Sequence, residues 1–298
     1  MSSPTGASPE VRRTRAVTGS VGAAVVGAVA YLAVSIGGGT SPDAGAVFGG
    51  IPTFAAADSS YEILESTAFV VGYDNARMNP LWASYRVFQI DEPYDFERPG
   101  RFNIDTRTTA RVKHEDYTNT GYTRGHMAPN DAIMTRYGRA AQKETFRMSN
   151  VSPQWGPLNS GPWENLESIV KEYAQAFEET WVITGPIFDE APRTLQRDFA
   201  HIDDPPPKPV QIPVAFYKIL IDVCAGRSVR TLSFVLPQTA SSTALRDLGL
   251  DLVDFLRPID DIEAATGIDF LWQLPDAVEA ALESATPQEM WPLDGVCP

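Results

Sequence analysis

The sequence predicts an α+β fold with a mixed or antiparallel sheet at its core. Two observations lead to this prediction: apolar runs of strand length recur along the chain, and few helical patterns lie between them. Regular alternation of strands and helices would instead have indicated a parallel α/β sheet. With 298 residues, 43% of them hydrophobic, the chain is long enough to bury one large core or two smaller ones.

The N-terminal part differs in composition from the rest of the chain. Residues 1–16 contain Ser, Pro and Arg and are expected to form a disordered tail. Residues 17–36 form an uncharged apolar run of about 20 residues, which is enough for one membrane span. Residues 37–47 have the Gly, Ser and Pro content of a linker. Residues 48–298 are the expected folded domain.

Three arginines, Arg12, Arg13 and Arg15, precede the apolar run. This asymmetry predicts that the N-terminus stays in the cytoplasm. The domain would then be anchored to the membrane and lie outside the cytoplasm, in a periplasm or at the cell surface. The run is long for the apolar part of a signal peptide, so an uncleaved anchor is favoured. The alternatives are cleavage near residues 44–46, which would secrete the domain, and a buried Gly/Ala helix.

Apolar runs in the domain predict its strands. Residues 69–73 and 82–88 are expected to be two strands separated by an Asn/Pro turn at residues 75–80. Further strands are expected at residues 102–105, 181–185, 210–223 and 230–236.

Three segments have helical patterns. The clearest is residues 163–179, in which apolar residues recur at three- and four-residue steps, and Pro162 fits only in its first turn. A shorter helix is expected at residues 140–148, with Phe146 facing inward. Residues 260–267 predict another short helix, which has an acidic start and a glycine stop.

Charge and cysteine content restrict the function classes. A net charge of −14 makes the chain a poor general binder of nucleic acid, because affinity for phosphate backbones comes mostly from Lys and Arg. A nucleic-acid role must therefore rest on a local patch, and residues 98–113 carry five basic residues against one acidic residue, Asp105. The two cysteines, Cys224 and Cys297, lack zinc-ligand spacing; a disulfide and two free thiols both stay open.

Two polar clusters carry the candidate chemistry. His126, one of three histidines, lies in residues 121–130, and Asn159 and Glu167 lie in residues 149–167. On one straight helix Asn159 and Glu167 would share a face about 12 Å apart, at 1.5 Å per residue. That spacing suits Asn159 as a ligand of Mg²⁺ and Glu167 as the holder of a metal-bound water, since Mg²⁺ keeps several waters. A base, an amide and a carboxylate are what metal-assisted phosphodiester hydrolysis needs.

In this pattern the chain resembles the DNA/RNA non-specific endonucleases of the ββα-metal superfamily, the group of mitochondrial endonuclease G and the secreted Serratia-type nuclease. The histidine motif of that family is Asp-Arg-Gly-His, and here it reads Thr123-Arg124-Gly125-His126. The resemblance spans about residues 48–275. The downstream signature of the family matches at Asn150, Pro153-Gln154, Asn159, Trp163 and Leu166-Glu167.

The resemblance implies a ββα-metal finger that carries the active site. In it, His126 would be the general base, and Asn159 would be the one direct protein ligand of Mg²⁺, with Mn²⁺ as a substitute. Glu167 would orient a water on the metal. The structural alternatives are a buried histidine, a helix cap at Asn159 and a solvated charge at Glu167.

The resemblance also implies roles for arginine. Arg124 would support the site or contact phosphate. Arg101, with Arg98 as the alternative, would stabilise the charge of the transition state; a plain surface role for Arg101 stays open.

The implied activity is cleavage of DNA and RNA to 5′-phosphate and 3′-hydroxyl ends. Members of the family often pair, which leaves a homodimer open. Thr123 brings no charge to orient its neighbours, and the net charge weakens attraction to nucleic acid. A catalytically weak or inactive nucleic-acid-binding module with the same fold is therefore the alternative, and a phosphodiesterase for a smaller substrate is a third hypothesis.

Overall fold

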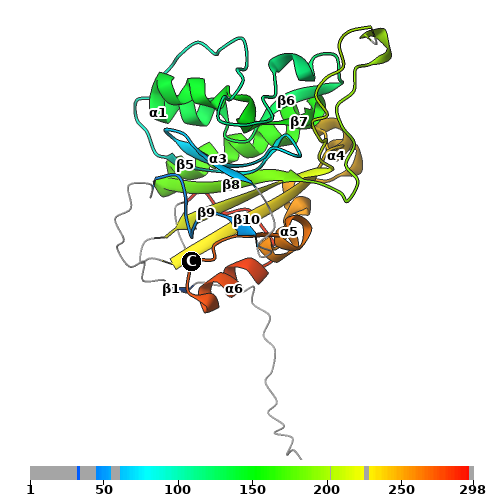
Figure 1. Ribbon diagram of the computed structural model, residues 1–298. Coiled ribbons are helices and arrows are strands. Elements are labelled where there is room, and N and C mark those ends of the chain that lie inside the picture. The colour runs from blue at the N-terminus through cyan, green and yellow to red at the C-terminus, as the bar shows by residue number, and fades with distance from the viewer. Residues whose placement is uncertain (1–31, 34–44, 55–60, 202, 225–227, 295–298) are drawn as a thin grey trace, which may run out of the picture.

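A seven-stranded antiparallel sheet forms the centre of the protein (Figure 1). The computed structural model describes residues 32–33, 45–54, 61–201, 203–224 and 228–294. The strand order is β1-β10-β9-β8-β5-β4-β3. These strands are β1 (Leu32–Ala33), β3 (Glu62–Glu65), β4 (Phe69–Asp74), β5 (Asn79–Phe88), β8 (Glu179–Ile187), β9 (Ala215–Val223) and β10 (Ser228–Pro237). The prediction of an α+β fold with an antiparallel sheet is thereby confirmed.

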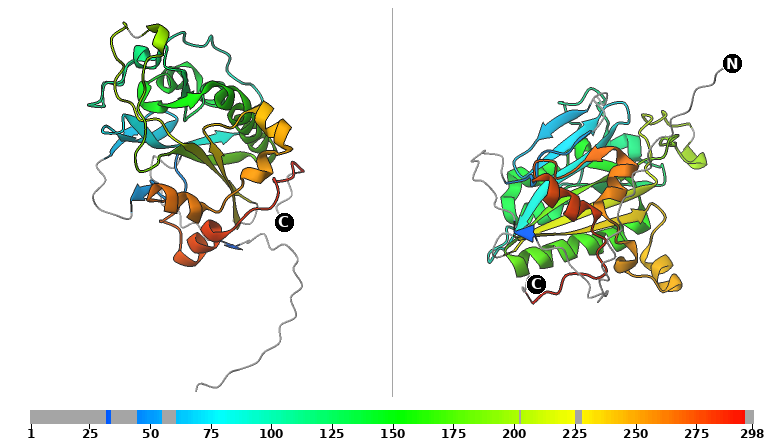
Figure 2. Two further views of the ribbon diagram at one scale, coloured as in Figure 1. Left: turned by 90° about the vertical axis from the view of Figure 1, so that its right-hand side faces the viewer. Right: turned by 90° about the horizontal axis from the view of Figure 1, so that it is seen from below.

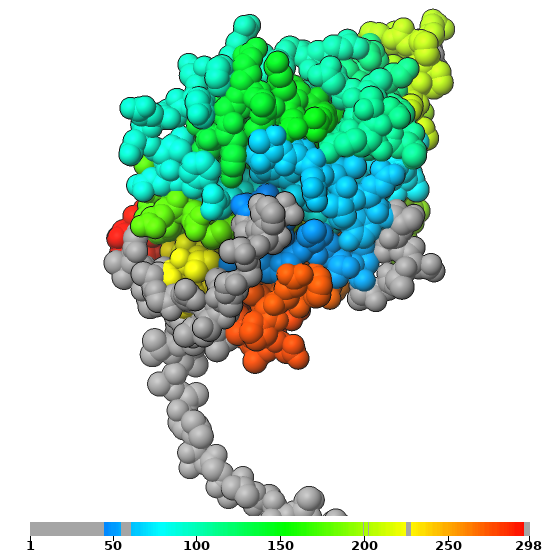
Figure 3. Space-filling model, turned by 60° about the vertical axis from the view of Figure 1, so that its left-hand side comes forward, coloured from blue at the N-terminus to red at the C-terminus, as the bar shows by residue number. Residues whose placement is uncertain are grey.

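Helices cover both faces of this sheet. α1 (Asn130–Thr145) and α3 (Glu164–Phe177) lie on one face, and α5 (Ile259–Thr266) and α6 (Asp276–Ser284) lie on the other (Figure 1, Figure 2). In the space-filling view, the green surface of the α1 layer and the orange surface of the α5 region lie on opposite sides of the blue strands (Figure 3). Because both faces are covered, β9 is buried along nearly its whole length, which explains why it is apolar apart from Lys218 and Asp222.

Shorter elements connect these layers. β2 (Thr53–Phe54) pairs with β11 (Ile268–Asp269) in a separate two-stranded sheet. α4 (Ser242–Leu248) is capped by Ser241, whose side chain accepts a hydrogen bond from Ala244 N. Short 3₁₀ turns lie at His114–Tyr117, Met148–Asn150, Phe199–His201 and Leu252–Phe255.

The helix predicted at residues 163–179 is α3. Its residues Leu166, Val170 and Tyr173 are buried in the cluster between this helix and the sheet. The helix ends at Glu178, whose φ of 73° turns the chain directly into β8. The short helix predicted at residues 260–267 is α5, and Gly267, with φ 72°, ends it as expected.

Two local predictions are wrong. Residues 102–105 form no strand and make only an isolated bridge from Asn103 to Arg147. The chain turns there because the Asp105 carboxylate is buried and held by side chains. The helix expected at residues 140–148 is α1, which begins much earlier. Gly138, with φ 79°, interrupts its backbone and hides its period in the sequence. Neither α4 nor α6 was predicted.

The expected membrane span lies mostly outside the described residues. Its described residues form β1, which pairs with Val229 and Ser228 of β10. No helix within the described ranges is long and apolar enough to cross a membrane. The tail at residues 1–16 and most of the expected linker are also outside the description. Cys224 is disulfide-bonded, whereas Cys297 falls among the residues that are not described.

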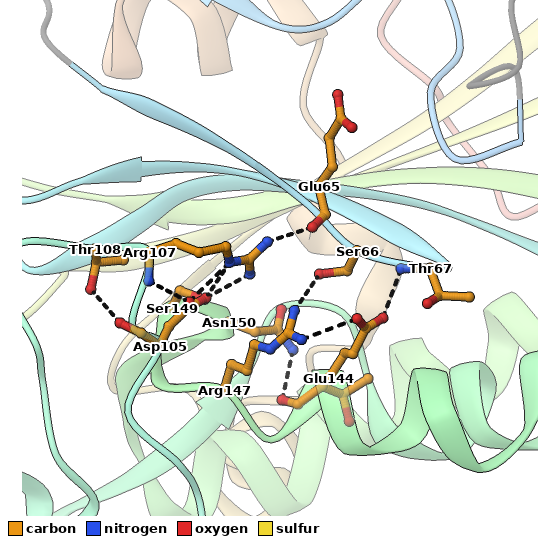
Figure 4. A network of polar contacts seen from close by, with 11 residues as sticks. Glu65, Ser66, Thr67, Asp105, Arg107, Thr108, Glu144, Arg147, Ser149 and Asn150 are labelled. Atoms are coloured by element: carbon orange, nitrogen blue, oxygen red, sulfur yellow. Dashed lines mark hydrogen bonds and ion pairs between the residues drawn. The ribbon is translucent and has the colours of Figure 1, made fainter.

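A polar network joins the loop before the candidate site to the edge of the sheet (Figure 4). Asp105, 3% exposed, accepts hydrogen bonds from Arg107 Nε at 2.9 Å and from Ser149 Oγ at 2.6 Å. Arg107 also donates to the main-chain carbonyl of Glu65 in β3. Burial opposes ionisation of Asp105, but the bonds from Arg107 and Ser149 outweigh it and lower the pKa of Asp105 to about 2.

Asp105 is expected to support the fold through its ionised form. Its folded pKa lies below the ordinary value of 3.8, so its contribution is present above pH 4 and is lost as the pH falls towards 2. The contribution is about 2 kcal/mol at neutral pH. The free energies of unfolding of wild type and Asp105→Asn, measured with urea, should therefore differ by about this amount at pH 6 and become equal near pH 2. A difference that does not change with pH would contradict the assignment.

Candidate active site

Two strands and a helix build the candidate site. β6 (Tyr122–His126) and β7 (Val151–Trp155) pair antiparallel, with His126 opposite Val151. β7 leads through α2 (Gly156–Leu158) and a π-helical turn, η3 (Asn159–Trp163), into α3. This is the ββα order expected for the active site (Figure 1).

Gly125 is required by the close packing of the two strands. A Cβ atom at this position would lie 2.2 Å from Oε1 of Gln154, which is fully buried. A larger residue would therefore push Gln154 and β7 away from β6. The buried Gln154 amide has no hydrogen-bond partner among the described residues. Close packing against Gln154 thus explains why the histidine motif has glycine at this position.

The imidazole of His126 lies between two aromatic rings. Its ring centroid is 5.0 Å from that of Phe102 and 5.1 Å from that of Phe146. The residue is 8% exposed, and Nε2 is buried with no hydrogen-bond partner in the described part of the chain. Burial, followed by the charge of Arg98, lowers the pKa of His126 to about 3. The imidazole is thus neutral at physiological pH, which is the protonation state of a general base.

Asn150 fixes the chain directly after His126. Its Oδ1 accepts a hydrogen bond from Ala128 N at 2.9 Å, and its Nδ2 donates to Ala128 O at 2.9 Å and Thr145 O at 3.1 Å. Its main-chain carbonyl accepts from Met127 N at 3.0 Å. The motif match at Asn150 therefore marks a residue that positions β6 relative to α1.

Asn159 is half-buried and begins the π-helical turn. The next residues depart from helical geometry, most clearly at Gly161 with φ −135° and ψ −111°. The expectation that one straight helix carries Asn159 and Glu167 is therefore wrong, and the spacing of about 12 Å derived from a rise of 1.5 Å per residue does not apply. Position 161 has no room for a larger residue, because a Cβ atom there would lie only 2.9 Å from Ser242 Oγ.

Glu167 interacts electrostatically with a buried lysine to which the motifs assign no role. Lys218 of β9 is fully buried, and its Nζ lies 4.2 Å from the centre of the Trp163 ring, with no hydrogen-bond partner among the described residues. Burial raises the pKa of half-buried Glu167, and the charge of Lys218 opposes that rise. Burial likewise lowers the pKa of Lys218, and Glu167 opposes that change. Each charge therefore stabilises the other.

Arg124 braces the loop before β6. Its Nε donates to the His114 carbonyl at 3.1 Å, and its Nη2 donates to Thr118 Oγ1 at 2.9 Å. The guanidinium also lies 5.8 Å from the centre of the Tyr117 ring. These contacts fit the supporting role that was expected for Arg124.

Arg98 and Arg101 differ in their relation to His126. Arg101 is exposed and pairs with Glu115. Arg98 lies 5.3 Å from the centre of the Phe146 ring, which contacts the imidazole, and its charge contributes to the low pKa of His126. Of these two residues, the geometry therefore places Arg98 within electrostatic reach of the imidazole.

Known proteins are similar to this chain over most of its length. The family model for DNA/RNA non-specific endonuclease matches residues 51–277. The chain belongs to this family. Endonuclease G of Bos taurus is 29% identical to this endonuclease over 213 residues, which cover 70% of this chain and 69% of that protein. The mitochondrial nuclease of Saccharomyces cerevisiae is 29% identical over 236 residues, which cover 74% of this chain and 69% of that protein.

A solved structure shares the fold of the endonuclease. The structure described as the EndoG/EndoGI complex contains a chain that matches with a TM-score of 0.60 at 22% identity. The match covers 73% of this chain and 88% of that chain. Human mitochondrial endonuclease G is 32% identical over 161 residues, which cover 54% of this chain and 52% of that protein.

Thr123 occupies the first position of the histidine motif in this endonuclease. Its hydroxyl donates to the Gln154 carbonyl at 2.8 Å, across the β6–β7 pair. An ionised aspartate has no proton to donate to that carbonyl. The threonine therefore adds a hydrogen bond within the finger while it removes a negative charge from the motif.

The site of the endonuclease fits a hydrated Mg²⁺ better than zinc. The Asn159 carboxamide makes no hydrogen bond to other described residues, so its oxygen is available as a ligand. Groups of three clustered carboxylates within the described ranges lie around α5 and α6, on the other face of the sheet. One amide oxygen with several waters suits Mg²⁺, whereas zinc prefers nitrogen and sulfur ligands.

Proposed function

We propose that this endonuclease hydrolyses phosphodiester bonds of DNA and RNA with Mg²⁺, for which Mn²⁺ can substitute. The observation that carries the proposal is the neutral imidazole of His126, whose Nε2 has no partner among the described residues. It ends β6 in the same finger that presents Asn159. When bound at Asn159, Mg²⁺ would stabilise charge on the phosphoryl oxygens and on the leaving 3′ oxygen.

Each side chain of the finger has one task in this proposal. His126 takes the proton of the attacking water at Nε2. Glu167, whose ionised form is favoured by the charge of Lys218 against the effect of burial, accepts a hydrogen bond from a water of the site. Asn150 holds the chain after His126 in place. Because Nε2 is buried, we propose that the aromatic side chains beside the imidazole, Phe102 and Phe146, move when the substrate binds.

The test is digestion of a supercoiled plasmid and of a long RNA with Mg²⁺ and with EDTA. We expect fragments only with the metal, and ends that a ligase joins without prior phosphorylation. The burial of the His126 imidazole between Phe102 and Phe146 favours one alternative function, that of a non-catalytic binding module. That module would hold labelled DNA in EDTA and yield no fragments with Mg²⁺. Faster hydrolysis of a dinucleotide ester than of long DNA would instead indicate a small-substrate phosphodiesterase.

Arg98 is expected to contribute more to the reaction than Arg101. Arg98→Ala should lower kcat/KM by about 100-fold, because a charge that faces the developing phosphoryl charge is lost. Arg101→Ala, which removes an exposed ion pair, should change kcat/KM by no more than about threefold. Steady-state kinetics on one oligonucleotide decide between them, and a larger effect of Arg101→Ala would contradict the choice.

Lys218 is expected to set the pH dependence of the reaction through Glu167. In Lys218→Met the pKa of Glu167 rises, since burial still raises it and the opposing charge is gone. The acidic limb of kcat/KM should move up by about one pH unit, so that activity lost at pH 7 returns at pH 9. Exposed Lys143→Met is the matched control and should keep the wild-type profile. Uniform loss at every pH would show a purely structural role.

We also propose that residues 17–36 tether the endonuclease to a membrane, outside the cytoplasm, or export it if they are cleaved. The uncharged apolar run after three arginines supports this location. Membranes from cells that express the full chain should retain it after alkaline extraction, unless cleavage has released it to the medium. Equal recovery from the cytosol with and without residues 17–36 would reject both routes. Light scattering of the purified chain would separate a monomer from the homodimer that the family suggests.

A further inference from the structure

Five carboxylates meet where α5, β11 and α6 come together, on the face of the sheet opposite the β6–β7 finger (Figure 1). They form two overlapping groups of three, and in each group one oxygen per residue lies within 4.8 Å of the others. Glu283 belongs to both groups. The groups are Asp260, Glu263 and Glu283, and Asp269, Glu279 and Glu283.

Glu283 is the buried member at the centre of this cluster. It is 6% exposed, and its Oε1 is buried without a hydrogen-bond partner in the described part of the chain. Burial, followed by the charges of Glu263 and Glu279, raises the pKa of Glu283 to about 8. A buried carboxylate oxygen that faces other carboxylates is costly unless a cation or a proton joins them.

No basic side chain of the described residues supplies that cation. None of the five carboxylates forms an ion pair with a described lysine, arginine or histidine. One of them has a partner of another kind: Glu263 Oε1 accepts a hydrogen bond from Phe270 N at 2.8 Å. The cluster therefore keeps an excess of negative charge around the buried Oε1 of Glu283.

The elements that carry the cluster are held by regular structure. α5 packs against α6, and β11 is paired to β2 through Ile268 and Asp269. Gly267, with φ 72°, ends α5 and turns the chain into β11. The carboxylates thus come from three fixed elements, which gives a preorganised set of ligands.

We propose that this cluster binds one hard divalent cation, Ca²⁺ by preference, through the carboxylate of Glu283 and the carboxylates around it. Ca²⁺ takes oxygen ligands at about 2.3–2.6 Å, so ligands on opposite sides of the ion lie about 5 Å apart. The oxygen separations of the cluster match that size. Donors that are all carboxylate select Ca²⁺, Mg²⁺ or Mn²⁺ over zinc, and their number favours Ca²⁺, because Mg²⁺ keeps several waters.

The bound ion would join α5 to α6 and stabilise the layer opposite the finger. This role is independent of the nuclease reaction. It remains in place if the proposed activity fails, and the two are measured separately.

Calorimetric titration of the metal-free full chain with calcium chloride tests the proposal. Asn159→Ala, which removes the proposed ligand of the other site, serves as the background. We expect one site in this background, and a melting temperature that rises with Ca²⁺. Glu283→Gln should weaken Ca²⁺ binding at least about tenfold and abolish the rise. Exposed Glu172→Gln on α3 is the matched control and should change neither.

Glu283→Gln has a second signature that shows whether it folds. Without Ca²⁺ and above pH 8, where Glu283 of wild type is ionised, the variant should melt above wild type, because the substitution removes a charge from the buried cluster. Half-buried Glu279→Gln provides a milder variant, with weaker Ca²⁺ binding. Absence of Ca²⁺ binding at millimolar concentration, or unchanged binding by Glu283→Gln, would overturn the site. Tighter binding of Mg²⁺ than of Ca²⁺ would overturn the choice of ion.

Discussion

Replacing His126 by alanine is expected to lower the rate of plasmid cleavage by about 100- to 10,000-fold, the range for loss of a general base. The imidazole is neutral because burial and the charge of Arg98 lower its pKa to about 3, so it is ready to accept a proton at neutral pH. Single-turnover cleavage of a labelled duplex at saturating Mg²⁺ measures this step without product release.

The other histidines provide the controls for His126. His201 is exposed and pairs with Asp198, and His201→Ala should keep the wild-type rate. His126→Ala should still unfold cooperatively, which separates lost chemistry from lost structure. If His126→Ala cleaves as fast as wild type, His126 is not the general base, and the proposed mechanism is rejected.

Replacing Asp222 by alanine is expected to destabilise the protein by about 3–5 kcal/mol, the range for breaking a buried ion pair on one side. Arg230 Nε lies 2.7 Å from Asp222 Oδ2, and the two side chains are 2% and 1% exposed. The guanidinium is also enclosed by the rings of Phe177 and Trp291, at 4.5 Å and 4.6 Å from their centres. The variant would leave this cation buried without its ion-pair partner.

Urea unfolding of the full chain measures the effect of Asp222. Asp247→Ala is the matched control, because Asp247 pairs with Arg246 on the surface, and it should change stability by less than about 0.5 kcal/mol. Adding Arg230→Met to Asp222→Ala should recover part of the loss, because methionine needs no charge partner. If Asp222→Ala and Asp247→Ala lower the free energy of unfolding equally, burial does not determine how much the Asp222–Arg230 ion pair contributes to stability.

The sheet could be predicted because its strands carry their own pattern. β4, β5, β8, β9 and β10 are apolar runs, since helices cover both faces of the sheet. α1 was predicted too short because Gly138 interrupts it, and residues 102–105 resembled a strand although contacts of Asp105 with distant side chains bend the chain there. Neither the effect of Gly138 on α1 nor the distant contacts of Asp105 can be recognised from the local sequence.

The site could be predicted only as far as its motifs reach. His126 and Asn159 lie in short segments whose spacing is regular enough to recognise, and the structure places them in one ββα finger. Glu167 lies on a helix and Lys218 on a strand that is distant in the sequence, so their interaction could not be predicted from local patterns. The only signal for it in the sequence is a lysine inside a mostly apolar strand. Arg98 was only the second choice, because nothing local shows that it lies over Phe146.

β3 is the last described strand at one end of the sheet, so it has an edge that another chain could extend. Glu62 and Glu65 flank the apolar pair Ile63 and Leu64 in this strand. Two copies joined edge to edge would bring like charges against each other, and the Glu65 carbonyl already accepts a hydrogen bond from Arg107. Charged edges of this kind oppose aggregation through sheet growth. Pairing between copies is therefore expected to use another surface.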